Sequence, residues 1–187
     1  MKSKNRIMDA AYQILIEDGY SGLTTRKISE EAGVDKALIY HHYGSKKGLI
    51  KKLIHKIGVE VEKEHEKIVR APQNEMLEQL LDLSFSMEEE GRWEFEKALL
   101  EIQAQASKDK ELSEKLEELD EKFLEILENI FNKLGASEPQ NTAEIYLSLV
   151  HGVLGRKTSL RDQEGLVKNR EQVKKVINQI MNDQPQK

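Results

Sequence analysis

Residues 24–49 read TTRKISEEAGVDKALIYHHYGSKKGL. Two short helical patterns meet in this stretch at Ala32-Gly33-Val34. A threonine hydroxyl before the first pattern and the Asp35 carboxylate before the second can each accept a hydrogen bond from the first turn of a helix. Gly33 permits the positive φ that a tight turn between two helices often requires. The spacing therefore predicts a helix-turn-helix.

The rest of the chain continues the helical pattern on both sides of this stretch. Apolar residues three and four positions apart predict a helix at about 4–18, which Gly19 ends, and a long helix at about 46–69. Further helical patterns lie at about 74–90, 92–107, 110–134, 140–155 and 166–182. The expected fold class is all-α.

The composition limits the chemistry that the chain can perform. Its 187 residues contain no cysteine, so a disulfide framework, a thiolate metal site and a thiol nucleophile are all excluded. We find no glycine-rich phosphate loop and no Glu-x-x-His pair in the sequence. We expect no enzyme activity, no cofactor, no metal site and no catalytic residues.

The charge is distributed unevenly along the chain. The net charge of −5 divides into +5 for residues 1–56, which hold 11 Lys/Arg and 6 Asp/Glu, and −10 for the remainder. A basic N-terminal part on an acidic body indicates a segment that faces nucleic acid. A surface bias without function is the alternative.

No segment of the sequence indicates a membrane or export. Glu17 and Asp18 interrupt the apolar residues near the N-terminus, so we expect no signal peptide. The most apolar later stretch, residues 145–154, is too short to span a bilayer. We expect a cytoplasmic protein without membrane contact.

The helix-turn-helix resembles that of the TetR family of bacterial transcriptional regulators. The matching residues, in the family's order, are Thr25, Ile28, Ala32, Gly33, Val34, Tyr40, Tyr43, Lys46 and Leu49. Ser29, Asp35 and Leu38 depart from common family residues, and the last removes a polar phosphate contact that some members have. The resemblance implies a three-helix DNA-binding domain at residues 1–48 and a helical effector-binding and dimerisation domain at residues 49–187.

The resemblance also implies which residues meet double-stranded DNA. The candidates are Thr25, Arg26, Lys36, Ala37, Tyr40, His41, His42, Lys46 and Lys47. Arg26 and Lys36 are the candidates for reading bases, because both can donate to guanine O6 and N7 in the major groove. Of the two histidines, one is expected to face DNA and the other to pack or face water. Most of the others are expected to contact phosphates, and Ala37 a thymine methyl.

The body is expected to form a homodimer and to hold a small-molecule effector. By resemblance, the last two helices of each subunit pack against those of the partner. The candidate effector-binding residues are Phe85, Trp93, Phe95, Leu99, Gln103, Phe123, Leu127, Tyr146 and His151. The alternative is that these aromatic and apolar side chains only fill a core.

These expectations combine into one functional hypothesis with two alternatives. The hypothesis is a dimeric repressor that a small molecule releases from a palindromic operator. The alternatives are a ligand-independent DNA-binding protein and a helical enzyme. The sequence names neither the effector nor the operator, and repression is chosen over activation by resemblance only.

Overall fold

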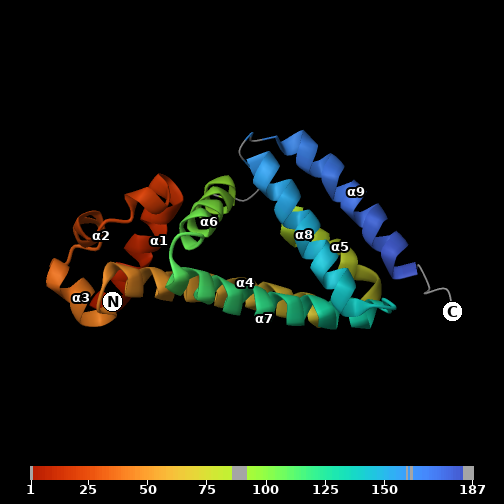
Figure 1. Cartoon of the computed structure of the whole chain (residues 1–187), viewed down its shortest axis with the longest axis horizontal. Helices are drawn as coiled ribbons and strands as arrows, with labels where there is room; N and C mark the ends of the chain where they lie inside the picture. The colour runs from red at the N-terminus through yellow and green to blue at the C-terminus, as the bar shows by residue number, and fades with distance from the viewer. Residues whose placement is uncertain (1, 86–91, 159, 161, 183–187) are drawn as a thin grey trace. The chain divides into compact units, whose positions relative to one another are not determined.

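The computed structural model describes residues 2–85, 92–158, 160 and 162–182. Within these residues the chain forms nine helices and no strand (Figure 1). The helices are α1 (Ser3–Gly22), α2 (Thr25–Glu31), α3 (Lys36–Tyr43), α4 (Lys46–Val69), α5 (Gln73–Phe85), α6 (Arg92–Ala106), α7 (Lys110–Leu134), α8 (Pro139–Thr158) and α9 (Gln163–Asn182). The prediction of an all-α fold with three N-terminal helices is confirmed.

The residues group into two compact units. The first comprises residues 1–58 and 91–117, with α1, α2, α3, α6 and the beginnings of α4 and α7. The second comprises residues 59–90 and 118–187, with the remainder of α4 and α7 and with α5, α8 and α9. The predicted division after residue 48 concerns function and stays a prediction.

Helix α1 carries the predicted apolar stripe and breaks at the predicted glycine. Its buried residues are Ile7, Ala10, Ala11, Ile14 and Leu15. Gly19 adopts φ 71° and ψ −171°, which interrupts the helix before one last turn ending at Gly22. The backbone N–H of Tyr20 then donates to Glu101 Oε2 of α6 at 2.7 Å. This bond satisfies a donor that the break leaves without a helical partner.

Substituting Gly19 by alanine should lower the free energy of unfolding by about 1–2 kcal/mol, because an L-residue with positive φ carries that cost. The added Cβ would also collide with the Glu101 carboxylate. Chemical denaturation measures the loss. Glu101→Ala is the companion variant, since it removes only the acceptor for Tyr20 and should cost about 1 kcal/mol. An unchanged midpoint for Gly19→Ala would contradict this account of the turn.

Helices α2 and α3 begin and end as their capping residues predict. Thr24 Oγ1 accepts from the N–H of Lys27 at 3.1 Å, so Thr24 and not Thr25 caps α2. Asp35 Oδ1 accepts from the N–H of Ala37 at 2.7 Å. Gly33, in the turn between these helices, has φ 60°. Ile28 and Ile39, which face the interior from the two helices, have no exposed surface.

Helix α4 follows the prediction closely. Ser45 Oγ accepts from the N–H of Gly48 at 2.9 Å and so caps its first turn. The helix ends at Val69, three residues before Pro72. It continues without a break from residues of the first unit to residues of the second.

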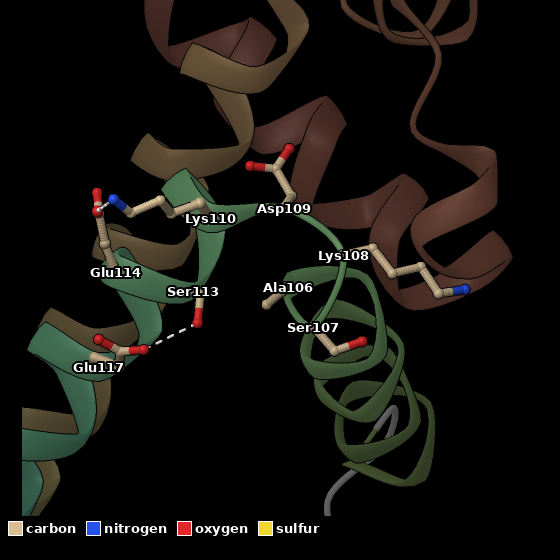
Figure 2. Close-up of a pocket in the computed structure, with 8 residues that line it drawn as sticks. All are labelled: Ala106, Ser107, Lys108, Asp109, Lys110, Ser113, Glu114 and Glu117. Carbon is tan, nitrogen blue, oxygen red and sulfur yellow. Dashed lines mark hydrogen bonds and ion pairs between the residues drawn. The ribbon is translucent and has the colours of Figure 1, made fainter.

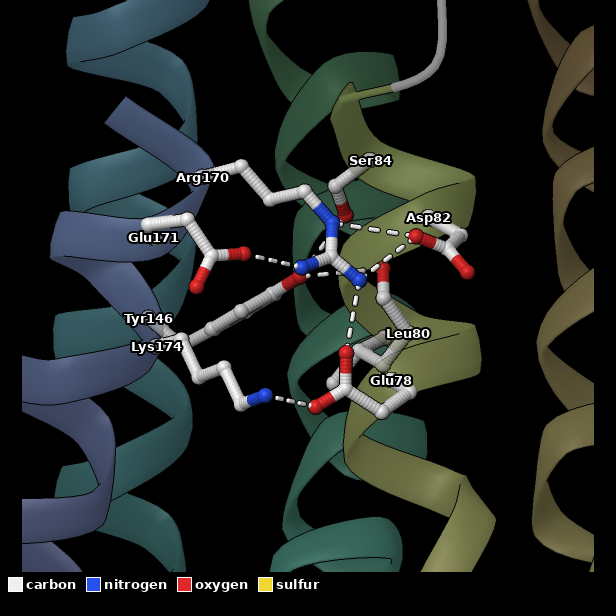
Figure 3. Close-up of polar contacts among 8 residues, drawn as sticks. All are labelled: Glu78, Leu80, Asp82, Ser84, Tyr146, Arg170, Glu171 and Lys174. Carbon is white, nitrogen blue, oxygen red and sulfur yellow. Dashed lines mark hydrogen bonds and ion pairs between the residues drawn. The ribbon is translucent and has the colours of Figure 1, made fainter. Parts of the chain in front are cut away.

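In the second unit α5, α8 and α9 pack around Tyr146 (Figure 3). The Tyr146 ring is 2% exposed and meets Phe131 edge-on, with 5.6 Å between ring centroids. Its hydroxyl donates to the carbonyl of Leu80 at 3.1 Å and shares a 2.8 Å hydrogen bond with Ser84 Oγ. Burial raises the pKa of Tyr146 well above its usual value, against the opposing effect of the Ser84 bond.

Beside Tyr146, a charged cluster joins α9 to α5 (Figure 3). The Arg170 guanidinium donates from Nη2 to Glu78 at 2.8 Å and to Asp82 at 2.6 Å. Lys174, one turn along α9, pairs with the other oxygen of Glu78. These hydrogen bonds and charges hold the Glu78 carboxyl pKa below its usual value, the bond from Lys174 contributing most.

Two predicted helix ends differ from the structure. Helix α8 extends to Thr158, three residues beyond the predicted end at about residue 155, because one interior glycine costs a helix only about 1 kcal/mol. Helix α9 begins at Gln163, three residues earlier than predicted, after Asp162 accepts from the N–H of Gly165 at 2.9 Å. Residues 86–90 of the predicted fifth helix lie outside the described residues.

Candidate nucleic-acid interface

Helix α3 presents one face of exposed side chains. Lys36, Ala37, Tyr40 and His41 are all exposed, while Ile39 is fully buried. Positions i, i+1, i+4 and i+5 share one side of a helix, so the four exposed residues lie together. The Tyr40 residue is 51% exposed, which argues against the alternative that it only packs in the core.

The end of α3 is tied to the beginning of α1. Ser3 Oγ and His42 Nε2 share a hydrogen bond of 2.8 Å, and the Tyr43 hydroxyl donates to the carbonyl of Lys4 at 2.9 Å. His42 is therefore the histidine that packs, and His41 is the exposed one. These contacts fix how α3 is oriented on α1.

Helix α2 begins with two of the candidate DNA-binding residues, Thr25 and Arg26. Thr25 is half-buried in the first turn of α2. The Arg26 side chain is 78% exposed and donates from Nε to Glu30 Oε1 at 2.9 Å. That hydrogen bond raises the pKa of Arg26. The i, i+4 spacing of the pair is a signal that the sequence already contained.

The two predicted phosphate-binding lysines at the start of α4 already have partners within the first unit. Lys46 Nζ lies 5.5 Å from the centroid of the Tyr20 ring. Lys47 Nζ lies 2.7 Å from Asp109 Oδ2 in the turn between α6 and α7. Sequence reasoning missed Asp109, because no local pattern connects two residues so far apart in the chain.

The candidate effector-binding residues divide between the two units. Leu99 and Gln103 belong to the first unit, whereas Phe85, Phe123, Leu127, Tyr146 and His151 belong to the second. Gln103 and His151 are exposed. The side chains of Trp93 and Phe95 lie outside the described part of the molecule. Effector binding by this set stays a prediction.

The structure describes one pocket in the first unit that the sequence did not suggest. It is an open depression of about 420 Å³ around the turn between α6 and α7 (Figure 2). Its lining residues are Ala106, Ser107, Lys108, Asp109, Lys110, Ser113, Glu114 and Glu117. None of the predicted effector-binding residues is among them, and the lining is mostly polar and charged, unlike the mainly apolar pockets typical of small-molecule sites.

Two further kinds of feature are absent from the described residues. There, no group of three or more His, Asp or Glu side chains is arranged to hold a metal ion. No helix in the same part of the chain is both long and apolar enough to cross a membrane.

Two capped helices joined by a tight glycine turn, the second with an exposed basic face, define a helix-turn-helix protein. Residues 7–53 match the family described as bacterial regulatory proteins, tetR family. Over this segment the chain is similar to the TetR family of bacterial regulatory proteins.

Known proteins resemble the chain in two ways. An uncharacterized HTH-type transcriptional regulator of Bacillus subtilis, YvkB, is 40% identical over 52 residues, which is 28% of each chain. The transcriptional repressor AcnR of Corynebacterium glutamicum is 36% identical over 47 residues, or 25% of each chain. A TetR transcription regulator from Haloarcula marismortui has the same fold along 96% of this chain and 98% of its own, with a TM-score of 0.85 and 22% identity. The matched sequence thus spans about a quarter of these curated relatives, and the structural likeness extends over the whole chain.

Proposed function

We propose that the protein is a transcriptional regulator that binds a specific double-stranded DNA sequence. The observation that carries the proposal is the exposed face of α3. On this face lie Lys36, Ala37, Tyr40 and His41, and no other described helix buries them. A helix of this size fits the major groove, and its first residues reach the base edges.

The proposed contacts divide into two kinds. Lys36 and Arg26 read bases, and Ala37 permits close approach to a thymine methyl. Thr25, Tyr40, Lys46 and Lys47 contact phosphates. His41 faces DNA, whereas the bond between His42 and Ser3 supports a positioning role for His42.

The wider proposal concerns assembly and control. The protein acts as a homodimer through α8 and α9, reads a palindrome and represses transcription in the cytoplasm, without enzyme activity. Residues 1–48 bind DNA and residues 49–187 bind the partner and a small-molecule effector. Family resemblance supports repression and effector control, and the relative AcnR is named a repressor. The uninterrupted α4 supports its role as the link between the two functions.

Selection from a random DNA pool tests the proposed function. The parent protein should enrich a palindrome at moderate salt, and Arg26→Ala should relax one base position in each half-site. Lys122→Ala is the matched control, because Lys122 is an exposed cation on α7 outside the first unit. Failure of the parent to enrich any sequence, with and without small-molecule extracts, would contradict the proposal.

A further inference from the structure

Two lysines of α4 face two carboxylates, Asp109 in the turn between α6 and α7 and Glu111 in the first turn of α7. Lys47 Nζ lies 2.7 Å from Asp109 Oδ2 and 3.9 Å from Glu111 Oε1. Lys51, one helical turn further along α4, pairs with Glu111 Oε2. All four residues belong to the first unit, so this contact lies within one compact body.

The Asp109 carboxylate also caps helix α7, and this second contact holds it in place. Its Oδ1 atom accepts from the N–H groups of Glu111 at 3.1 Å and Leu112 at 3.4 Å, which caps the first turn of α7. Leu112 is 1% exposed and anchors that turn in the core. The cap therefore leaves Oδ2 directed at Lys47 (Figure 2 shows the turn).

The charges persist at neutral pH. The hydrogen bond from Lys47 lowers the pKa of Asp109, and the bond from Lys51 lowers that of Glu111. The hydrogen bond with Asp109 raises the pKa of Lys47 in turn. Protonation of either carboxyl would require acid well below neutral pH.

We propose that the carboxylates of Asp109 and Glu111 compete with DNA phosphates for the two lysines of α4. Asp109 and Glu111 hold Lys47 and Lys51 in the DNA-free protein, and DNA binding exchanges these carboxylates for phosphate oxygens. The proposal rests on the proposed DNA-binding function. It assigns a regulatory role to two acidic residues that lie outside the helix-turn-helix.

The competition is expected to reduce affinity without preventing binding. The side chains of Lys47 and Asp109 are 42% and 25% exposed, so water and salt screen the pair. DNA, with one phosphate charge about every 1.7 Å along its axis, displaces such a carboxylate readily.

The test is a double-mutant cycle on binding of the full chain to a random-sequence duplex and to a selected operator. Asp109→Asn keeps an oxygen for the α7 cap and removes the charge. It should tighten binding about three- to tenfold at low salt and alter the slope of log K against log salt, because Lys47 no longer exchanges a carboxylate for a phosphate. In the Lys47→Ala background the same substitution should have no effect. Glu117→Gln, which removes an exposed carboxylate elsewhere on α7, is the charge control and should change little.

The outcomes separate the competition from the proposed function. If the parent binds DNA and Asp109→Asn changes neither affinity nor slope, the competition is wrong and the function stands. If the gain persists in Lys47→Ala, loss of a negative charge near DNA explains it, and the competition is again wrong. Binding by Asp109→Asn but not by the parent would support strong competition. Binding by neither would contradict both proposals.

Discussion

Lys36→Ala should weaken binding to the operator by about 30-fold to about 20,000-fold. A side chain that pairs well with a base edge contributes about 1–3 kcal/mol of discrimination, and a dimer loses that contact in both half-sites. Lys36 is exposed in the first turn of α3, where recognition helices contact base edges. Equilibrium binding to the selected operator and to a scrambled duplex measures the effect.

The scrambled duplex distinguishes a base contact from a phosphate contact. Loss of a base contact should leave affinity for the scrambled duplex nearly unchanged, whereas loss of a phosphate contact weakens both complexes equally. Lys122→Ala is again the control for the loss of one positive charge. Equal weakening on both duplexes would remove Lys36 from the base-reading residues.

Tyr146→Ala should lower the free energy of unfolding by about 3–5 kcal/mol, as expected when a large aromatic is removed from a core. The ring is 2% exposed and packs against Phe131 among α5, α8 and α9. Urea denaturation followed by circular dichroism measures the loss. DNA binding provides a second readout, because α8 and α9 are the proposed dimer helices.

Tyr146→Phe separates the ring from its hydroxyl. It keeps the packing and removes the bonds to Ser84 Oγ and the Leu80 carbonyl, so it should cost only about 0.5–1.5 kcal/mol. If Tyr146→Ala were as stable as Tyr146→Phe, the ring would not be the centre of this core. That result would instead favour the alternative in which Tyr146 and its neighbours line an effector pocket.

The helix-turn-helix could be predicted almost completely from sequence, because its determinants are local. A capping side chain such as Asp35 acts on backbone groups two or three residues away. A glycine such as Gly19 ends a helix through its own φ. The inward residues follow the helical period, which is also a local property.

The partners of the functional side chains were harder to predict. The pairing of Arg26 with Glu30 follows from helical spacing, but the pairing of Lys47 with Asp109 depends on how α6 and α7 return to α4. The charged cluster around Arg170 is similar, because its partners Asp82 and Glu78 precede it in the chain by 88 and 92 positions. Such contacts are set by tertiary packing, which composition and periodicity do not specify.

The candidate effector-binding residues show the same limit more strongly. Apolar and aromatic side chains at helical spacing look alike whether they fill a core or line a pocket. Tyr146 illustrates this, since its ring is buried and its hydroxyl is already bonded within the second unit. Effector screening by thermal shift is a more direct route to that site than sequence.

Recognition of a DNA sequence through α2 and α3 is tested by the ratio of two affinities of the purified protein, for the selected palindrome and for a scrambled duplex. At about 150 mM salt, sequence-specific recognition predicts a ratio of at least about 1,000. Equal affinities, both falling steeply with salt, would mean that the basic N-terminal part binds only phosphates and would contradict sequence-specific recognition.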